Sequence, residues 1–317
     1  MAIALRLGTR PSALALAQAA IVRDLLLRAV PGLSVEIVPI RTTGDRLTSA
    51  SLANLGGKGL FIKELEQALE RREIDLAVHS MKDLPAALSP QFRIAAVPAR
   101  EDPRDAVISR GAGTIDELPN GASVGTSSIR RRLLALRRNP KLNVLPLRGN
   151  IDTRLKRVED GGIDAIIIAM AGLKRLGHTT TLRVCEIDAT EFIPAGGQGA
   201  LCVEALADGK AGASSEVEHA LTTITDARAR YEISAERAFL ATIGASCVTP
   251  VGVHAVVRDA AFSLRAILFS SDGSREIADA VEDLTDADLA PSVATEVGVR
   301  LGERMLAHGA AALVGDA

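Results

Sequence analysis

Short apolar runs alternate with longer amphipathic stretches over the first hundred residues. The apolar runs are bounded by turn-forming or charged residues and predict strands at Ile3–Leu7, Val35–Ile40 and Asp75–His79. The amphipathic stretches predict helices at Ser12–Arg28, which begins at a capping serine, and at Leu60–Arg72. Strands that alternate with helices are typical of an α/β fold with a mostly parallel, doubly wound sheet.

A second series of the same kind follows a crossover at Pro98–Pro103. Its strands are predicted at Asp105–Ser109, Ser123–Gly125, Asn143–Leu147 and Asp164–Ala169, with helices that begin at Ser128 and Ile151. The glycine-rich stretch Pro194–Gly199 then precedes an apolar strand, Ala200–Glu204, which we expect to return to the first sheet. Two crossovers between two α/β lobes predict a hinged cleft like that of periplasmic binding proteins.

The pattern changes from about Ser214. Helical periodicity continues to Ile243, three alternating segments follow, and a last helix is predicted from Ala287 to His308. The alternating segments are Val251–Val257, Phe262–Phe269 and Glu276–Val281. They predict a small α+β domain with an antiparallel sheet. The predicted domains are residues 1–98 with 197–213 (first α/β lobe), 103–193 (second α/β lobe) and 216–317 (α+β domain).

Composition and charge exclude several kinds of partner. Hydrophobic residues make up 47% of the 317 positions, but aromatic residues only 2%, which argues against a surface that stacks nucleic-acid bases. The net charge of −2 provides no general attraction to nucleic acid or to anionic membranes. No apolar run approaches the ~18 residues of a membrane span. We therefore expect neither nucleic acid nor a membrane as partner.

The three cysteines are Cys185, Cys202 and Cys247, and their spacing fits no metal site. An odd number of cysteines without an export signal is typical of reduced thiols in the cytoplasm. Cys185 and Cys202 lie in apolar runs, and we predict that both are buried. Cys247 lies among Gly, Ser and Pro in a predicted loop. A loop cysteine is most often incidental, and the alternative is a nucleophile or an attachment point.

One predicted buried strand ends abruptly in His79, Ser80, Lys82 and Asp83. Open α/β sheets bind ligands at the carboxyl ends of their strands, so we predict that Asp83 lies at the mouth of a cleft. The alternative is a turn or helix-capping aspartate. His79 is predicted to be a core histidine whose partner is the backbone, and the alternative is an acid–base residue. The glycine-rich segment Leu55–Gly59 is either a lid over the cleft or a linker.

Arginine recurs at predicted strand-to-helix turns, in a chain with 30 arginines and 7 lysines. The turns are Gly8–Ser12, Gly125–Arg131, Leu147–Asn150 and Gly172–Arg175. Each combines a guanidinium with the free N–H groups of a helix N-terminus, which together attract anions. Four such turns on two lobes predict a cleft for a polyanion of carboxylates or phosphates. In such a cleft Asp83 either neutralises charge or handles a cation of the substrate.

Eight segments, in order along the chain, resemble those of the porphobilinogen deaminase (hydroxymethylbilane synthase) family. They are Gly8–Ala15, Gly56–Phe61, Ala77–Asp83, Glu101–Asp105, Val124–Arg131, Leu147–Asn150 with Thr153–Leu155, Ala171–Gly177 and Gly197–Ala200. The resemblance implies a transferase of tetrapyrrole and heme biosynthesis. It would join four porphobilinogen molecules head to tail, with loss of ammonia, into hydroxymethylbilane, as a cytoplasmic monomer.

The resemblance also implies a covalent dipyrromethane cofactor, attached by a thioether to the cysteine that corresponds to Cys247, and a catalytic carboxylate that corresponds to Asp83. Cofactor contacts would fall on Ser80, Lys82, Asp83, Thr126, Ser128, Arg130, Arg131, Arg148 and Gly149. Substrate carboxylates would bind Arg10, Ser12, Arg148, Arg154 and Arg175, and a mobile active-site loop would contain Lys58 and Phe61.

The chain departs from the family pattern around its cysteine. Ala245–Ser246 stand where two glycines are usual, and Val248–Thr249 stand where a glutamine is usual soon after the cysteine. Asn54 also replaces a lysine that some members carry. The main rival class is a solute-binding or ligand-sensing protein, which would need neither Asp83 nor Cys247. A phosphate-ester enzyme ranks third, because the chain has no P-loop and no metal-ligand cluster.

Overall fold

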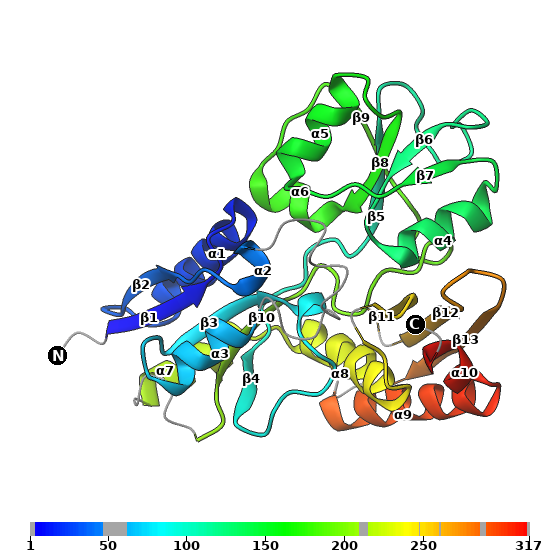
Figure 1. The fold of residues 1–317 in the computed structure, drawn as a ribbon. Helices are drawn as coiled ribbons and strands as arrows, with labels where there is room; N and C mark the ends of the chain where they lie inside the picture. The colour runs from blue at the N-terminus through cyan, green and yellow to red at the C-terminus, as the bar shows by residue number, and fades with distance from the viewer. Residues whose placement is uncertain are drawn as a thin grey trace.

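Three separate β-sheets organise the chain in the computed structural model, which describes residues 4–46, 62–208, 215–246, 248–259, 261–285 and 290–315 (Figure 1). We call the region around the first sheet the N-terminal lobe, that around the second the central lobe, and that around the third the C-terminal domain. An α/β fold with two lobes and a small third domain is thereby confirmed.

The N-terminal lobe has a five-stranded sheet of order β2-β1-β3-β10-β4. Its strands are β1 (Ala4–Thr9), β2 (Ser34–Pro39), β3 (Leu76–Ser80), β4 (Phe92–Ala96) and β10 (Leu201–Leu206). Its helices are α1 (Ala13–Ala29), α2 (Thr43–Arg46), α3 (Lys63–Glu70) and α7 (Ser215–Thr223). Helix α1 begins where the Ser12 side chain accepts a hydrogen bond from the Ala15 N–H, as its capping position predicted.

The central lobe repeats this arrangement with the order β7-β6-β8-β5-β9. Its strands are β5 (Asp105–Ser109), β6 (Ser123–Gly125), β7 (Asn143–Leu145), β8 (Ala165–Ala169) and β9 (Arg183–Glu186). Its helices are α4 (Ile129–Arg138), α5 (Ile151–Glu159) and α6 (Met170–Leu176). The two lobes share a strand order although the sequence shows no internal repeat.

Each sheet contains one strand that runs against its neighbours, so the sheets are mixed rather than simply parallel. In the N-terminal lobe β10 is antiparallel to β3 and β4, and in the central lobe β5 is antiparallel to β8 and β9. Both reversed strands directly follow a crossover between the lobes. A reversed strand begins beside the carboxyl end of its parallel neighbour. Both crossovers therefore arrive at the edge of the sheet where ligands bind.

The hydrophobic pattern located the outer strands β2 and β7 but missed the other two, β4 and β9. Both are short, and β9 has no fully buried residue. An edge strand that is only partly covered lacks the continuous apolar run that reveals a central strand. Cys185 lies on β9 and is only partly buried, so the prediction of a buried thiol was wrong for Cys185 and is confirmed for Cys202.

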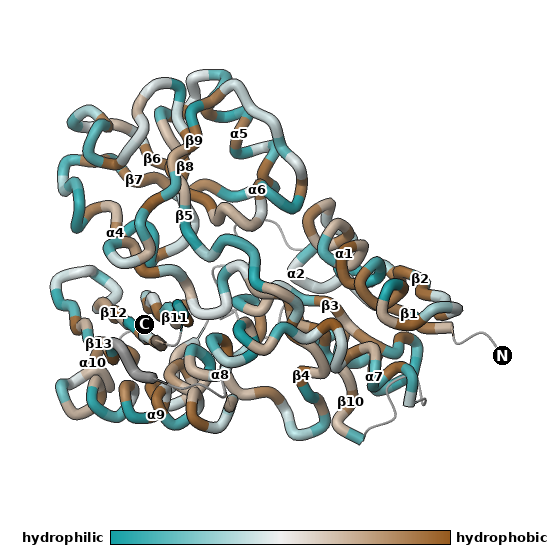
Figure 2. Tube along the Cα trace, turned by 180° about the vertical axis from the view of Figure 1, so that it is seen from behind, coloured by the Kyte–Doolittle hydropathy of each residue, from teal (hydrophilic) through white to brown (hydrophobic). Residues whose placement is uncertain are grey.

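The C-terminal domain packs two long helices on a three-stranded antiparallel sheet. It consists of α8 (Ala227–Thr242), β11 (Val251–Arg258), β12 (Ala261–Phe269), β13 (Glu276–Thr285), α9 (Pro291–Ala307) and α10 (Ala310–Gly315). Its core contains the edge-to-face pair of Tyr231 and Phe262, with ring centroids 4.9 Å apart. Figure 2 shows apolar residues along the strands and polar residues on the outer turns.

A separate hydrophobic cluster joins the N-terminal lobe to α8. It includes Met81 and Leu84 beside the end of β3, Cys202 on β10, and Ala229 and Ile233 on α8. The chain segment that follows β3 therefore rests on the C-terminal domain as well as on its own lobe. This packing fixes the backbone on either side of Asp83.

Helix α9 approaches α8 closely at Gly298. A Cβ atom on Gly298 would lie 2.2 Å from the Ala235 carbonyl oxygen and 2.9 Å from the Ala238 Cβ atom. We predict that Gly298→Ala lowers the free energy of unfolding by about 1–3 kcal/mol, because the helices must separate. The control is Gly315→Ala in α10, where no atom lies within 4 Å of the added carbon. Equal thermal melting temperatures for both variants would contradict the prediction.

Candidate active site

The segment after β3 places its polar side chains at the carboxyl end of the N-terminal sheet. Met81–Asp83 forms a single 3₁₀ turn, in which the Met81 N–H donates to the Ala200 carbonyl (3.0 Å) and the Leu84 N–H donates to the Met81 carbonyl (3.2 Å). Met81 and Leu84 are buried, whereas Asp83 is exposed. Apolar anchors on both sides thus hold a carboxylate that projects from the sheet.

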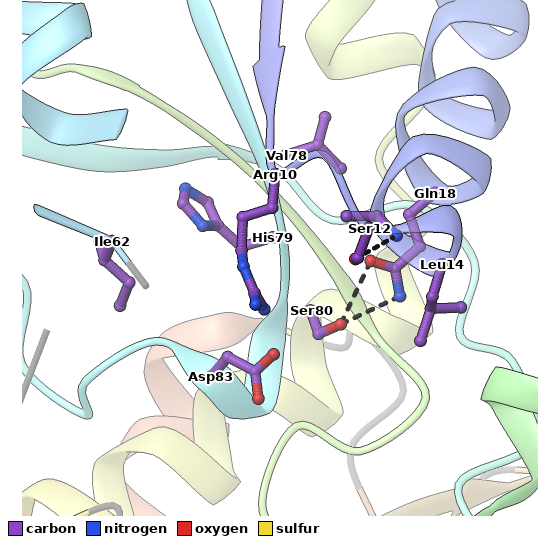
Figure 3. A pocket seen from close by; sticks show the side chains of 10 residues that line it. Arg10, Ser12, Leu14, Gln18, Ile62, Val78, His79, Ser80 and Asp83 are labelled. Atoms are coloured by element: carbon purple, nitrogen blue, oxygen red, sulfur yellow. Dashed lines mark hydrogen bonds between the residues drawn. The ribbon is translucent and has the colours of Figure 1, made fainter. Parts of the chain in front are cut away.

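A cavity of about 70 Å³ lies beside Asp83 and is lined by Arg10, Ser12, Gln18 and Ser80, among others (Figure 3). The Gln18 Nε2 group donates to Ser80 Oγ at 3.0 Å. The Arg10 Nε group donates to Asp45 Oδ1 at 3.1 Å. Small-molecule sites typically have ~300–1,000 Å³, so this cavity suits one polar substituent of a ligand rather than a whole ligand.

Asp83 differs from most carboxylates of this region because it has no ion-pair partner among the described residues. Asp45 pairs with Arg10, and Asp105 pairs with Arg130 and Arg131. Asp83 is exposed at the cavity wall and makes no such contact with the described parts of the chain. It is therefore available to a ligand and lines a cavity as predicted, and it also lies in a turn, the 3₁₀ turn Met81–Asp83.

Asp105 neutralises the two arginines at the start of α4. It is fully buried, and it accepts hydrogen bonds from Arg130 Nη2 (2.8 Å) and Arg131 Nε (2.9 Å). Burial by itself would raise the pKa of Asp105, but the charges of Arg130 and Arg131 outweigh it and lower the pKa to about 2. The sequence left two roles open for a carboxylate among arginines: to neutralise their charge or to handle a cation of the substrate. Asp105 has the first of these roles.

Lys82 is linked to the cluster of Asp105, Arg130 and Arg131 by the neutral side chain of Gln198. Its Nζ group donates to Gln198 Oε1 at 3.3 Å, and Arg131 Nη2 donates to the same oxygen at 3.2 Å. Burial, followed by the charge of Arg131, lowers the pKa of Lys82 to about 8, although Asp83 opposes the shift. Lys82 is thus a half-buried cation that donates to an amide oxygen and not to a carboxylate among the described residues.

Thr126 and Ser128 shape the beginning of α4. Thr126 is buried, and its Oγ1 atom accepts from the Ser128 N–H at 3.2 Å. Ser128 is the N-cap residue and accepts from the Arg131 N–H at 3.4 Å. The two hydroxyls therefore orient the helix that carries Arg130 and Arg131.

The remaining predicted arginines lie on the central lobe. Arg148 and Gly149 are exposed just before α5, and the Gly149 carbonyl accepts from Arg154 Nε at 2.9 Å. Burial and the charge of Arg131 lower the pKa of Arg154, which indicates that these guanidiniums lie in the same region. Burial lowers the pKa of Arg175 to about 10.

The placement of Arg175 corrects one predicted turn. Gly172–Arg175 was expected to connect a strand to a helix, but these residues lie inside α6, and Arg175 belongs to its last turn. Its Nη2 group donates to the Gly199 carbonyl at 2.6 Å, at the second crossover. Arg175 thus faces the site from the C-terminal end of a helix, where the helix N–H groups contribute nothing to anion binding.

His79 is buried as predicted, but its partner is not the backbone. Its Nε2 atom lies 3.0 Å from Glu204 Oε2 on the neighbouring strand β10. Both side chains are almost fully buried. The expected backbone partner was wrong because β10 pairs with β3 and places Glu204 opposite Ala77, two residues from His79 along the strand.

Three predicted site residues, Lys58, Phe61 and Cys247, lie outside the described residues, as do Asn54 and the glycine-rich segment Leu55–Gly59. The neighbours of Cys247 are described. The Ser246 N–H donates to Thr249 Oγ1 at 2.9 Å, and the Thr249 N–H donates to the Ser246 carbonyl at 3.1 Å. Two of the four residues that depart from the family pattern, Ser246 and Thr249, therefore bond to each other across position 247.

Sequence reasoning gave no role to Gln18 and Gln198. Gln18 interrupts an apolar helical face, and its burial next to Ser80 explains the interruption. Gln198 is buried between the lobes, where its Nε2 group donates to the Pro103 carbonyl (2.7 Å) and to Asp105 Oδ1 (2.9 Å). A lone amide within an apolar or glycine-rich stretch was the available signal in both cases.

Comparison with known proteins identifies the family. Residues 5–213 match the family model described as "Porphobilinogen deaminase, dipyromethane cofactor binding domain", and residues 230–307 match that described as "Porphobilinogen deaminase, C-terminal domain". The chain belongs to the porphobilinogen deaminase family. The resemblance seen in the eight sequence segments is thus confirmed.

Relatives named porphobilinogen deaminase match most of the chain. The protein of Sorangium cellulosum is 48% identical over 86% of this chain and 88% of its own length. The protein of Syntrophobacter fumaroxidans is 41% identical over 96% of this chain and 95% of its own length. Among solved structures, the periplasmic aliphatic sulphonate binding protein SsuA from Escherichia coli aligns with 96% of this chain and 88% of its own, at 15% identity and a TM-score of 0.43.

The Asp105 cluster generates a stability prediction. Asp105→Asn leaves two buried guanidiniums without a carboxylate, and we expect a loss of about 3–5 kcal/mol in the free energy of unfolding at pH 7. The control is Asp116→Asn, which removes a half-exposed ion pair with Arg138 and should cost less than about 1 kcal/mol. Urea unfolding measures both losses.

The loss of unfolding free energy in Asp105→Asn should become smaller at low pH. Because folding lowers the pKa of Asp105 to about 2, its contribution is complete above the unfolded pKa of about 3.9 and disappears as the pH falls toward 2. The gap between wild type and Asp105→Asn should therefore narrow below about pH 4. A gap that does not change between pH 7 and pH 2 would refute the assignment.

Proposed function

We propose that this chain is a hydroxymethylbilane synthase, a transferase that deaminates four porphobilinogen molecules and joins them head to tail. The observation that carries the proposal is an exposed Asp83 that has no ion-pair partner among the described residues and lines a cavity with Arg10, within a chain of the porphobilinogen deaminase family. We further propose that Cys247 carries the dipyrromethane cofactor. We also propose that the chain acts as a monomer in the cytoplasm, which rests on the family resemblance.

The donor set suits a dipyrromethane, whose two rings carry carboxylate side chains and N–H groups. Lys82 presents a half-buried ammonium to Gln198, which is neutral and cannot balance its charge. The Arg130 Nε group is buried and has no hydrogen-bond partner within the described parts of the chain. Anionic groups would satisfy these donors, and Asp83 would accept from ring N–H groups. When bound, the cofactor supplies the first acceptor ring for chain growth.

Asp83 is the proposed catalytic residue. Loss of ammonia from porphobilinogen leaves an electron-poor ring, and a carboxylate beside the ring N–H stabilises the positive charge that develops. Asp83 suits this role because no guanidinium or ammonium of the described residues already occupies it. The more strongly neutralised Asp105 does not, because both of its oxygens bond to arginines.

The other predicted residues are proposed to bind carboxylates. Arg10 and Ser12 line the Asp83 cavity, while Arg148, Arg154 and Arg175 lie on the central lobe. Ser80, Thr126, Ser128, Arg131 and Gly149 complete the proposed cofactor contacts. Arg130 and Arg131 each donate to Asp105, so only their remaining N–H groups are available for a ligand carboxylate.

Three sheets with separate strand sets support the proposed division into 1–98 with 197–213, 103–193 and 216–317, except that α7 packs into the core of the N-terminal lobe. The alternative function, an anion-binding solute-binding or ligand-sensing protein, is disfavoured by the family match over both segments. Such a protein would bind porphobilinogen without releasing ammonia. An ammonia assay with purified protein separates the two functions.

Substitution of Asp83 tests the catalytic assignment. Asp83→Asn preserves shape and removes charge, so we expect turnover to fall at least about 100-fold, the usual effect of losing one charge-stabilising group. Intact mass spectrometry should show that this variant still exceeds its sequence mass by a dipyrromethane, whereas Cys247→Ser should not. Near-normal turnover in Asp83→Asn, or active wild-type protein of bare sequence mass, would overturn these assignments.

The pKa of Lys82 predicts a pH effect on substrate binding. As the pH rises through about 8, Lys82 loses its charge, and the KM for porphobilinogen should increase. Lys82→Arg keeps its charge because the guanidinium pKa exceeds about 12, so its KM should stay flatter between pH 7 and 9. Lys141→Arg, at an exposed position, controls for the substitution itself. The same rise in all three proteins would exclude Lys82 as the cause.

A further inference from the structure

A groove of about 270 Å³ lies between the N-terminal lobe and the C-terminal domain. Ile94 and Val97 line it from the lobe, and Arg230, Ile233, Ser234 and Arg237 line it from α8. It shares no lining residue with the Asp83 cavity. The proposed reaction therefore leaves the groove without a role.

Arg237 is an unusual cation in this groove. Its Nη2 group donates to the Ala86 carbonyl at 2.7 Å, and its Nη1 group lies 3.9 Å from the Met81 sulfur. Within the described ranges, no carboxylate oxygen lies within 4 Å of this guanidinium. Burial lowers the pKa of Arg237, and the charge of Glu204 opposes the shift without cancelling it. An anion in the groove would relieve this cost.

Arg230 provides a second charge on the same helix face. It lies seven residues before Arg237, which is two helical turns, and its side chain is exposed. Ser234 lies between them and Ile233 adds an apolar wall, with Ile94 and Val97 opposite. The lining thus combines two guanidiniums with aliphatic surface, which fits a ligand that has one anionic end and one apolar end.

We propose that this groove binds a small organic carboxylate, about one ring in size, whose carboxylate lies between Arg230 and Arg237. The volume is just below the ~300–1,000 Å³ range of drug-sized ligands, which limits the occupant to a single ring. A carboxylate is preferred because the planar fork of arginine matches it with two parallel hydrogen bonds.

Occupancy of the groove would influence the active site through Arg237. This residue holds Met81 and Ala86, on either side of Lys82 and Asp83. A ligand that draws the guanidinium toward itself competes with the Ala86 carbonyl and loosens the segment. The expected effect is a lower kcat, and this part of the inference rests on the proposed role of Asp83.

The probe is 3-phenylpropionate, which has one ring and one carboxylate and lacks the aminomethyl group needed for turnover. Isothermal titration calorimetry on the complete holoprotein should detect binding in wild type and in Arg228→Ala, an exposed arginine of α8 that does not line the groove. Affinity should fall about fivefold in Arg230→Ala. Arg237→Lys should also bind more weakly, because it keeps the charge but loses the fork.

Steady-state kinetics distinguishes this groove from the active site. The inference predicts that 3-phenylpropionate lowers kcat in wild type and Arg228→Ala, and does so less in Arg230→Ala. It is overturned by purely competitive inhibition, by equal affinity in Arg230→Ala, or by no binding up to about 10 mM. Turnover without 3-phenylpropionate is measured separately. A negative result for the groove therefore does not contradict the proposed function.

Discussion

The site depends on the hydrogen bonds of one buried amide, Gln198. Its Nε2 group donates to Asp105 and Pro103, and its Oε1 atom accepts from Lys82 and Arg131. An amide has two donors and two acceptor positions, so this side chain is fully satisfied. Lys82 of the N-terminal lobe and Arg131 of the central lobe therefore donate to the same oxygen, Gln198 Oε1. The relative position of the two lobes at the site is therefore set by hydrogen bonding rather than by apolar packing alone.

The second crossover between the lobes, which contains Gln198, also connects to the C-terminal domain. The Gln198 carbonyl accepts from Arg100 Nε, and Arg100 pairs with Glu232 and Glu236 on α8. Glu236 in turn accepts from the Gly197 N–H. These are buried charges, so each needs its partner to offset the loss of water. A continuous polar network thus runs from Lys82, next to Asp83, to α8, beside the groove that Arg237 lines.

The sequence located the strands that are covered on both faces and the polar residues at their ends. It could not reveal strand direction, because an apolar run looks the same in a parallel and an antiparallel strand. The reversed strands β5 and β10 bring Asp105 and Gln198 to the ligand-binding edge. Because the sequence could not reveal the reversal, it also gave neither residue a place at the site. Arg175 was misplaced for a local reason, since a short helix that starts directly after β8 leaves no separate turn.

The sequence by itself determined the chemistry available: a carboxylate after a buried strand, arginines at the starts of two helices, and a family pattern that spans both matched segments. Only the tertiary structure decided which carboxylate those arginines neutralise. Asp83 and Asp105 both stand near basic residues in the sequence, yet Asp105 is buried against two guanidiniums, whereas Asp83 is exposed and pairs with none in the part of the chain that the structure describes. The reason is distance along the chain. Local patterns record neighbours a few residues apart, whereas Gln198 meets Asp105 across 93 residues and Lys82 across 116.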